Sequence, residues 1–205
     1  EALWADLPDY VQGDKTTLCV ADGSGSMLTS VGNTGVTCLD VANALAIYFA
    51  ERCKGPFHDC YITFSEHPQL VRMNGSRSLR NRIEIARHYN EIANTNIEAV
   101  FELILETARR NRLSQKELPA NVLILSDMEF DVATCSRPDE TLFETLAARY
   151  ARYGYRLPRL VFWNICSRTG VIPVRENGLG VALVSGFSPA VTRMVLSGRT
   201  DPYEC

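Results

Sequence analysis

The sequence lacks any apolar run long enough to cross a membrane: its runs are strand-sized, and a spanning helix needs about 20 apolar residues. No signal peptide opens the chain, and neither sign of charge dominates, with a formal net charge of -3 over 205 residues. These absences argue against a membrane protein and against broad electrostatic binding to nucleic acid or anionic lipid. We therefore expect a cytoplasmic protein with no membrane partner.

Cysteine pairs with metal-binding spacing are also absent. The seven cysteines are spread along the chain without a CxxC pair, which argues against a zinc site made of thiolates. Cys19, Cys60 and Cys166 lie in apolar runs, where a free cysteine packs as a small hydrophobe. The odd number and wide spacing favour a reducing, intracellular environment over a disulfide-stapled secreted domain.

A chain of this length can bury one α/β core. The sequence opens at Glu1 without a methionine, so we expect one domain over residues 1–205, with its core at about 14–200, cut from a longer protein. The nearest approach to a basic patch is the run 77–82, with Arg87 beyond it. Because Glu84 lies within this segment, we interpret it as the solvated face of a helix.

Continuous apolar segments alternate with amphipathic ones along the chain. This order is typical of a mostly parallel sheet covered on both faces, and it predicts a Rossmann-like α/β sandwich of three layers. The connection 65–68 is too short for a parallel crossover, so its flanking strands must form an antiparallel hairpin at the sheet edge. We expect strands at 16–21, 60–64, 69–73, 121–125, 160–165 and 181–184, and helices at about 37–52, 97–108, 139–153 and from Ser188 onward.

The stretch ADGSGSM directly follows the first predicted strand. Asp22, Ser24 and Ser26 supply oxygen side chains at alternate positions, and Gly23 and Gly25 allow the backbone between them to turn tightly. In open α/β sheets, ligands bind outside the carboxyl ends of the strands, where the strand order reverses. The loop therefore predicts a binding site at this sheet edge.

Thr95 and Asp127 provide two further oxygens at the same edge. Thr95 opens the longest amphipathic helix, and Asp127 ends another apolar strand. A ligand set made only of oxygens suits Mg²⁺ or Mn²⁺ rather than Zn²⁺. Two carboxylates and three hydroxyls leave such an ion an open electrophilic face, which favours an incoming carboxylate or phosphate.

Simpler explanations exist for each of these residues. The D-x-S-x-S motif could be a glycine-rich turn that caps a helix, Thr95 could be a helix N-cap, and Asp127 could cap the segment that follows its strand. Glu129 and Asp131 could be solvated loop acids. Asn164, in an otherwise apolar strand, needs hydrogen-bond partners if it is buried, and it could bond a neighbouring loop rather than support the site.

Taken together, these residues resemble a von Willebrand factor A-type (vWA) domain with its metal ion-dependent adhesion site (MIDAS). The resemblance covers about residues 14–200, and the predicted antiparallel edge hairpin agrees with it. It implies a Mg²⁺ ion, with an acidic residue of a partner protein completing its coordination. The implied ligands are Asp22, Ser24, Ser26, Thr95 and Asp127, some through water, and the residues placed to support them are Gly23, Gly25, Asn96, Ser126, Glu129, Asp131 and Asn164.

Three segments narrow the resemblance. SDMEFD at 126–131, VFWN at 161–164 and VSGFS at 184–188 are similar to the vWA-type C-terminal part of an uncharacterised family of larger intracellular proteins. That family is similar in turn to the vWA half of the Ro-type RNA-binding ring proteins. Any contact with RNA would then lie in a domain absent from this chain.

Three functions follow, of which we expect the first. It is a binding module that captures an acidic group through the metal ion and performs no chemistry. The second is a Mg²⁺-dependent phosphoester hydrolase in which Asp131 activates water. Against it, Asp22 lacks the second carboxylate of a D-x-D motif, and His58, His67 and His88 share no spacing with the motif. The third is a component of a Ro-like ribonucleoprotein.

Overall fold

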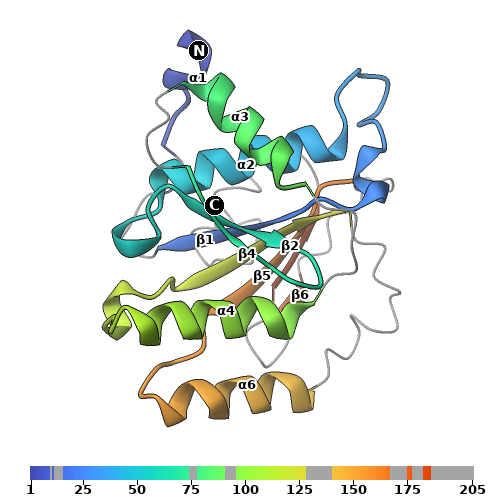
Figure 1. Cartoon of the computed structure of the whole chain (residues 1–205). Coiled ribbons are helices and arrows are strands. Elements are labelled where there is room, and N and C mark those ends of the chain that lie inside the picture. The colour runs from blue at the N-terminus through green and yellow to red at the C-terminus, as the bar shows by residue number, and fades with distance from the viewer. Residues whose placement is uncertain are drawn as a thin grey trace.

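The structure is a computed structural model that describes residues 1–9, 11, 16–73, 78–90, 96–127, 140–166, 175–176 and 182–185. In this part of the chain, one sheet has the strand order β3-β2-β1-β4-β5-β7-β6 (Figure 1). The strands are β1 (Thr17–Asp22), β2 (Cys60–Phe64), β3 (Leu70–Arg72), β4 (Asn121–Ser126), β5 (Arg159–Asn164), β6 (Arg175–Glu176) and β7 (Ala182–Ser185).

The strand pairing confirms the predicted fold class. The five inner strands pair in parallel, and β3 runs antiparallel to β2 at one edge, as the short connection required. At the other edge β6, a strand that the sequence did not predict, pairs antiparallel with β7. The molecule is therefore the expected mostly parallel α/β sandwich, with a second short antiparallel strand added.

Helices cover both faces of this sheet. The structure gives α1 (Ala2–Ala5), α2 (Cys38–Arg52), α3 (Leu79–His88), α4 (Ile97–Arg110) and α6 (Glu140–Arg152), with short 3-10 turns η1 (Gly25–Leu28), η2 (Gly55–Phe57) and η3 (Gln115–Glu117). In Figure 1, α2 and α3 lie on one side of the sheet, and α4 and α6 lie on the other. The helix predicted from Ser188 lies outside the described residues.

Each central strand sends alternate side chains into two separate cores. In β4, Leu123 and Leu125 pack on the α2 side, whereas Val122 and Ile124 pack on the α4 side. The strands β1 and β5 alternate in the same way. Since both faces are covered, the strands are buried along their length, which is why they are almost continuously apolar in sequence.

The helix starts agree with the sequence in one case and differ in another. Thr37 caps α2 in a full capping box: its hydroxyl accepts from the Asp40 amide, and the Asp40 carboxylate accepts from the Thr37 amide. For α4 the N-cap is Asn96, whose Oδ1 accepts from the Ala99 amide at 3.0 Å, and not Thr95, which we considered as an alternative cap. Thr95 itself lies outside the described residues.

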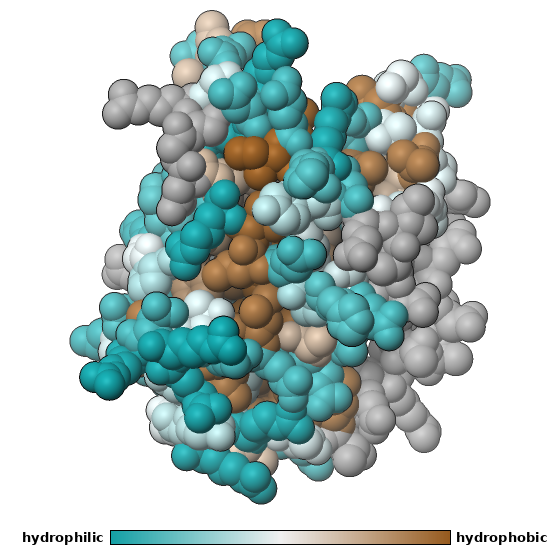
Figure 2. All heavy atoms as spheres, in the orientation of Figure 1, coloured by the Kyte–Doolittle hydropathy of each residue, from teal (hydrophilic) through white to brown (hydrophobic). Residues whose placement is uncertain are grey.

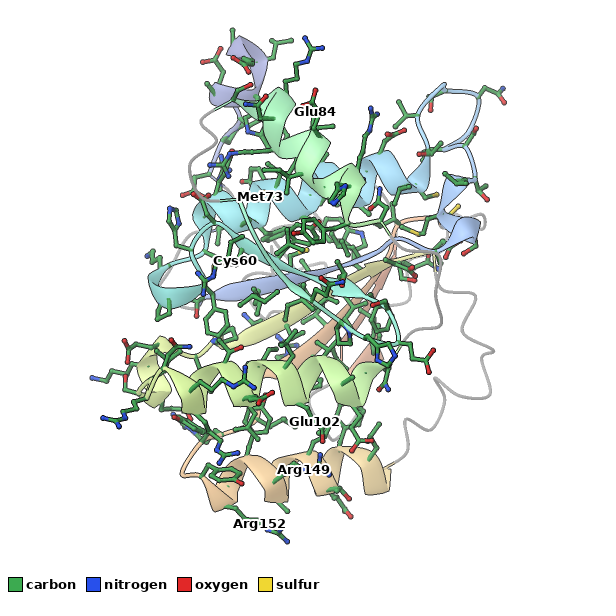
Figure 3. The ribbon with its side chains drawn as sticks, viewed as in Figure 1. Cys60, Met73, Glu84, Glu102, Arg149 and Arg152 are labelled. Atoms are coloured by element: carbon green, nitrogen blue, oxygen red, sulfur yellow. The ribbon has the colours of Figure 1, made fainter. Side chains whose placement is uncertain are left out.

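Helices α4 and α6, which cover the same face of the sheet, are joined by aromatic and charged contacts. The Tyr150 hydroxyl of α6 donates to the Phe101 carbonyl of α4 at 2.7 Å, in a buried position. Arg149 pairs with Glu102 and also lies 3.3 Å from Glu98, and Figure 3 shows Arg149 pointing from α6 toward Glu102 on α4. These contacts fix α6 against α4 and so close this face of the sandwich.

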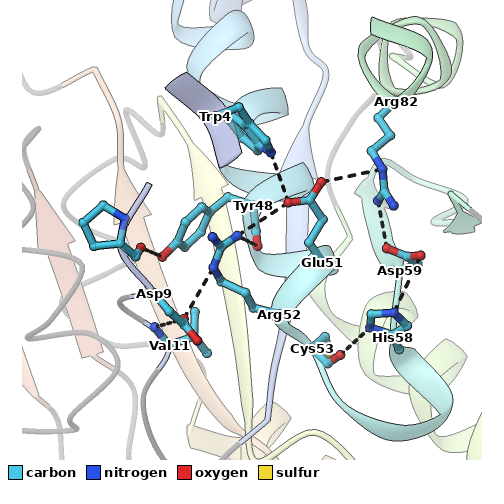
Figure 4. Close-up of polar contacts among 11 residues, drawn as sticks. Trp4, Asp9, Val11, Tyr48, Glu51, Arg52, Cys53, His58, Asp59 and Arg82 are labelled. Carbon is cyan, nitrogen blue, oxygen red and sulfur yellow. Dashed lines mark hydrogen bonds and ion pairs between the residues drawn. The ribbon is translucent and has the colours of Figure 1, made fainter. Parts of the chain in front are cut away.

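The basic segment is a helix, as expected, but its central arginine is not solvated. Arg82 of α3 is only 9% exposed, and its guanidinium lies 2.8 Å from Asp59 and 3.6 Å from Glu51. Figure 4 shows that Glu51 also accepts from the indole of Trp4, at 3.1 Å. This charged cluster therefore ties α3 and the N-terminal segment to the last turn of α2.

Among the described residues, none of the helices is both long and apolar enough to span a bilayer. Figure 2 shows hydrophilic side chains over α3 and α4, with apolar ones gathered in the band between the two helical layers.

Breaking the Arg82 cluster will destabilise the fold. Arg82→Ala leaves the carboxylates of Asp59 and Glu51 without their shared cation in a largely desolvated position, so we expect a loss of about 3 kcal/mol in the free energy of unfolding. The matched control is Arg80→Ala on the same helix, because the Arg80 side chain is 85% exposed and, among the described residues, its ion pair is with exposed Glu84. We expect that variant to lose less than about 0.5 kcal/mol in urea unfolding, and equal losses would contradict this account.

The α2 capping box makes part of the stability depend on acid. Hydrogen bonds from the Thr37 amide and hydroxyl, then Arg87, hold the pKa of Asp40 below its ordinary value of 3.8. A lowered pKa in the folded state stabilises the protein above the ordinary pKa, and this contribution is lost as the pH falls through the folded value. Asp40→Asn should therefore cost about 0.5 kcal/mol at neutral pH and nothing in strong acid, measured by urea unfolding across that range. A constant difference at all pH values would contradict it.

Candidate metal site at the carboxyl edge of the sheet

The candidate site lies at the carboxyl ends of β1 and β4, where the strand order of the sheet reverses. Asp22 is the last residue of β1, and Ser126 is the last residue of the neighbouring strand β4. The chain leaves β1 toward α2 on one face and enters β4 from α4 on the other, so the strand order reverses between β1 and β4 (Figure 1). The strand order therefore puts the D-x-S-x-S loop and Asp127 at the position where such sheets bind ligands.

Asp22 is a buried carboxylate held by two neutral donors. Its side chain belongs to a residue only 3% exposed. One oxygen accepts from the Ser24 amide at 2.8 Å, and the other accepts from the buried hydroxyl of Ser126 at 2.5 Å. Among the described residues, no Lys, Arg or His forms an ion pair with it. The negative charge of Asp22 is therefore hydrogen-bonded but not neutralised.

Ser24, Ser26 and Asp127 form a row of oxygens beside this carboxylate. The hydroxyls of Ser24 and Ser26 are 3.0 Å apart, and the Ser26 hydroxyl donates to Asp127 Oδ1 at 3.1 Å. Since the Ser26 hydrogen is used on Asp127, Ser24 must donate to Ser26. Ser26 is exposed whereas Asp22 is buried, so the row runs from the protein interior to solvent.

A single apolar side chain fixes the loop against the strand end. Met27 is fully buried, and its sulfur accepts from the Asp127 amide at 3.0 Å. The 3-10 turn η1 adds a bond from the Met27 amide to the Ser24 carbonyl, and Thr29 donates from both amide and hydroxyl to the Ser26 carbonyl. This role of Met27 was not predicted from the sequence, although the apolar pair Met27 and Leu28 in an otherwise polar loop is a usable signal for an anchor.

The other predicted residues divide into three groups. Thr95, Glu129 and Asp131 lie outside the described residues. Gly23 and Gly25 lie in the loop itself, and Ser126 contacts Asp22 directly. Asn164 ends β5 opposite Ser126, and its Oδ1 accepts from the Cys166 amide at 2.9 Å, a local turn of the structural kind that the sequence left open. Asn96 lies at the start of α4 as its cap.

A thiol near the site is not activated. Burial, together with the neighbouring Cys166 and Asp127, raises the pKa of the Cys38 thiol to about 12. A thiol with so high a pKa is protonated at neutral pH and is a poor nucleophile. Cys38 therefore packs beside the loop as a small apolar group.

The oxygens present fit a hard divalent cation. Neighbouring ligands in an octahedral Mg²⁺ shell, each about 2.1 Å from the ion, lie about 3 Å apart, which matches the spacings of Ser24, Ser26 and Asp127. Among the described residues, no three His, Cys, Asp or Glu side chains cluster closely enough to hold an ion by themselves. An ion here would therefore depend on serine hydroxyls together with Asp22 and Asp127.

A family model described as a domain of unknown function, DUF7788, matches residues 16–204. The chain belongs to this family. The chain is also similar to the uncharacterized protein L728 of Acanthamoeba polyphaga mimivirus, to which it is 32% identical over 203 residues. That match covers 97% of this chain but 34% of the viral protein, so the DUF7788 chain spans about a third of that relative.

Solved structures show the fold of the DUF7788 chain. The Deinococcus radiodurans Ro (RSR) protein superposes over 95% of this chain and 36% of its own, with a TM-score of 0.53 and 18% identity. The SpRpn10 VWA domain matches over 90% and 94% of the two chains, with a TM-score of 0.47 and 13% identity. The sheet order and the Ro similarity confirm the vWA-like fold expected from the sequence. The metal site stays a prediction.

The hydrogen bond from Ser126 to Asp22 should be one of the more stabilising interactions of the candidate site. Ser126→Ala removes a hydroxyl that donates to a buried carboxylate, so we expect a loss of about 2 kcal/mol in the free energy of unfolding. Ser24→Ala is the matched control, since its hydroxyl is only half-buried and meets another hydroxyl. That variant should lose less than about 1 kcal/mol in urea unfolding without metal. A larger loss for Ser24→Ala would contradict this ranking.

Proposed function

We propose that the DUF7788 chain is a metal-ion-dependent protein-binding module, not an enzyme. Mg²⁺, or Mn²⁺, would be held by Asp22, Ser24, Ser26 and Asp127, with Thr95 as a further ligand. The ion would capture an acidic side chain of a partner protein. The observation that carries this proposal is the buried carboxylate of Asp22, which has neutral hydrogen-bond donors and lies beside an oxygen row that reaches solvent.

Burial makes a cation at this position favourable. Placing an ionised carboxylate in the interior costs several kcal/mol unless an opposite charge or several hydrogen bonds compensate. Asp22 has two such bonds, each to a neutral group, and each carboxylate oxygen keeps a lone pair. Asp22 could therefore contribute to an ion directly or through water, while Ser126 and the Ser24 amide hold its orientation.

The exposed end of the oxygen row favours an anionic partner. Two carboxylates balance the charge of a divalent ion, and the serine hydroxyls add none, so the ion would remain electrophilic toward solvent. Ser26 is exposed, so a partner group can approach from that side. A carboxylate of Asp or Glu has the size and charge to complete such a coordination shell.

The alternatives receive less support from the described residues. The Cys38 thiol beside the loop is not activated, and His58 lies near the start of β2, where its ring bonds the Cys53 carbonyl at 2.8 Å. For RNA binding, the arginines of α3 are engaged with acids: Arg80 with Glu84, Arg82 with Asp59 and Arg87 with Asp40. A helix whose cations are paired offers a weak field for phosphates.

Calorimetric titration of Mg²⁺ and Mn²⁺ into metal-stripped protein tests the proposal. We expect one-to-one binding by the wild type and none by Asp22→Asn, which keeps the shape of the side chain and removes its charge. Without metal, Asp22→Asn should be at least as stable as the wild type, because it no longer buries a charge. Metal should raise the melting temperature of the wild type alone.

Glu66→Gln is the matched control for this titration. Glu66 is an exposed acid just after β2, at the same sheet edge, and its removal should leave metal binding unchanged. The titration is repeated with acetate, which supplies the carboxylate that a partner would provide. Absence of binding in both conditions, or equal binding by Asp22→Asn, would refute the metal site.

A further inference from the structure

The loop that continues from the candidate site carries no charge at all. Every residue from Gly23 to Leu39 is uncharged, between Asp22 at one end and Asp40 at the other. Asp40 is itself engaged, since it accepts from Thr37 and lies 3.4 Å from Arg87. An acidic partner approaching this face therefore meets no unopposed carboxylate on the loop.

This loop forms a hydrogen-bonded hairpin. Ser30 and Thr37 form an antiparallel bridge, and the Val31 amide donates to the Val36 carbonyl at 2.8 Å. Gly32 has a φ of +57°, the left-handed conformation that glycine adopts without strain at such a turn. The Cys38 amide bonds the Thr29 carbonyl at 2.9 Å, so the hairpin joins the start of α2 without a break.

Two large apolar side chains on this segment face solvent. Leu28 is 58% exposed and Val36 is 45% exposed, whereas Val31 packs against the core on the α2 side. In Figure 2, brown side chains gather at the upper right, where Figure 1 places this loop. Isolated exposed apolar residues are ordinary, but two of them on one uncharged segment beside a binding site suit a contact with an apolar group.

We infer that the partner segment carries a bulky apolar residue next to its acidic residue. The acid would bind the metal ion held at Ser24, Ser26 and Asp127, and the apolar side chain would pack on Leu28 and Val36, which we name the apolar platform. This inference rests on the proposed function and specifies its ligand. The charge pattern supports it: an uncharged surface next to a cation favours a segment whose only charge is the captured acid.

A displayed peptide library with a fixed central Asp or Glu and random flanking positions tests the inference. The library is selected on the wild-type chain in Mg²⁺ and, separately, in EDTA. Peptides recovered only in Mg²⁺ should be enriched in Leu, Ile, Phe, Met or Trp beside the acid. The double variant Leu28→Gln/Val36→Thr should bind the selected peptide about tenfold more weakly, as expected for the loss of one apolar contact.

Two measurements separate the apolar platform from the metal site. The double variant should bind Mg²⁺ as the wild type does, because neither residue is a metal ligand. The control Leu3→Gln, at an 86% exposed leucine of α1, should leave peptide affinity unchanged. Mg²⁺-dependent acidic peptides without apolar enrichment, or with unchanged affinity for the double variant, would overturn the platform and leave the proposed function standing. Absence of any Mg²⁺-dependent selection would overturn both.

Discussion

The parallel pairing of β1 with β4 is the constraint on which the site depends. Their register sets Ala21 opposite Leu125, so the next residues, Asp22 and Ser126, meet at the carboxyl end and form their short hydrogen bond. A shift of one residue would turn every side chain to the other face of the sheet. The two apolar cores hold this register, and thus the same burial that stabilises the sandwich also positions a carboxylate at its edge.

Much of this arrangement could be predicted from the sequence because strong, local patterns encode it. The continuous apolar strands, the stripe of α4 and the capping box of α2 each depend on residues close together in the chain. The order of the D-x-S-x-S motif and Asp127 places them at one sheet edge once a parallel sheet is assumed. The motif and its resemblance to a vWA domain therefore predict the position of the candidate site from the sequence alone.

What the sequence could not provide are contacts between distant segments. Arg82 looked solvated because it lies in a basic run with Glu84 nearby, yet it is buried and pairs with Asp59 and Glu51, which are far away in sequence. The Met27 contact with Asp127 likewise joins two loops that only folding brings together. The capping role that we considered for Thr95 belongs to Asn96, because the two residues have similar capping tendencies and only geometry distinguishes them.

Helix α3 braces α2 at both ends. Arg87, in the last turn of α3, reaches Asp40 in the first turn of α2, while Arg82 reaches Glu51 in its last turn. Axial sliding of α2 by a single residue, about 1.5 Å, would strain both ion pairs together. The hairpin beside the candidate site leads directly into α2. Because α3 opposes axial movement of α2, it also holds the base of this hairpin in place. The two ion pairs together therefore favour a single axial position of α2, and with it a single position of the hairpin, relative to the sheet.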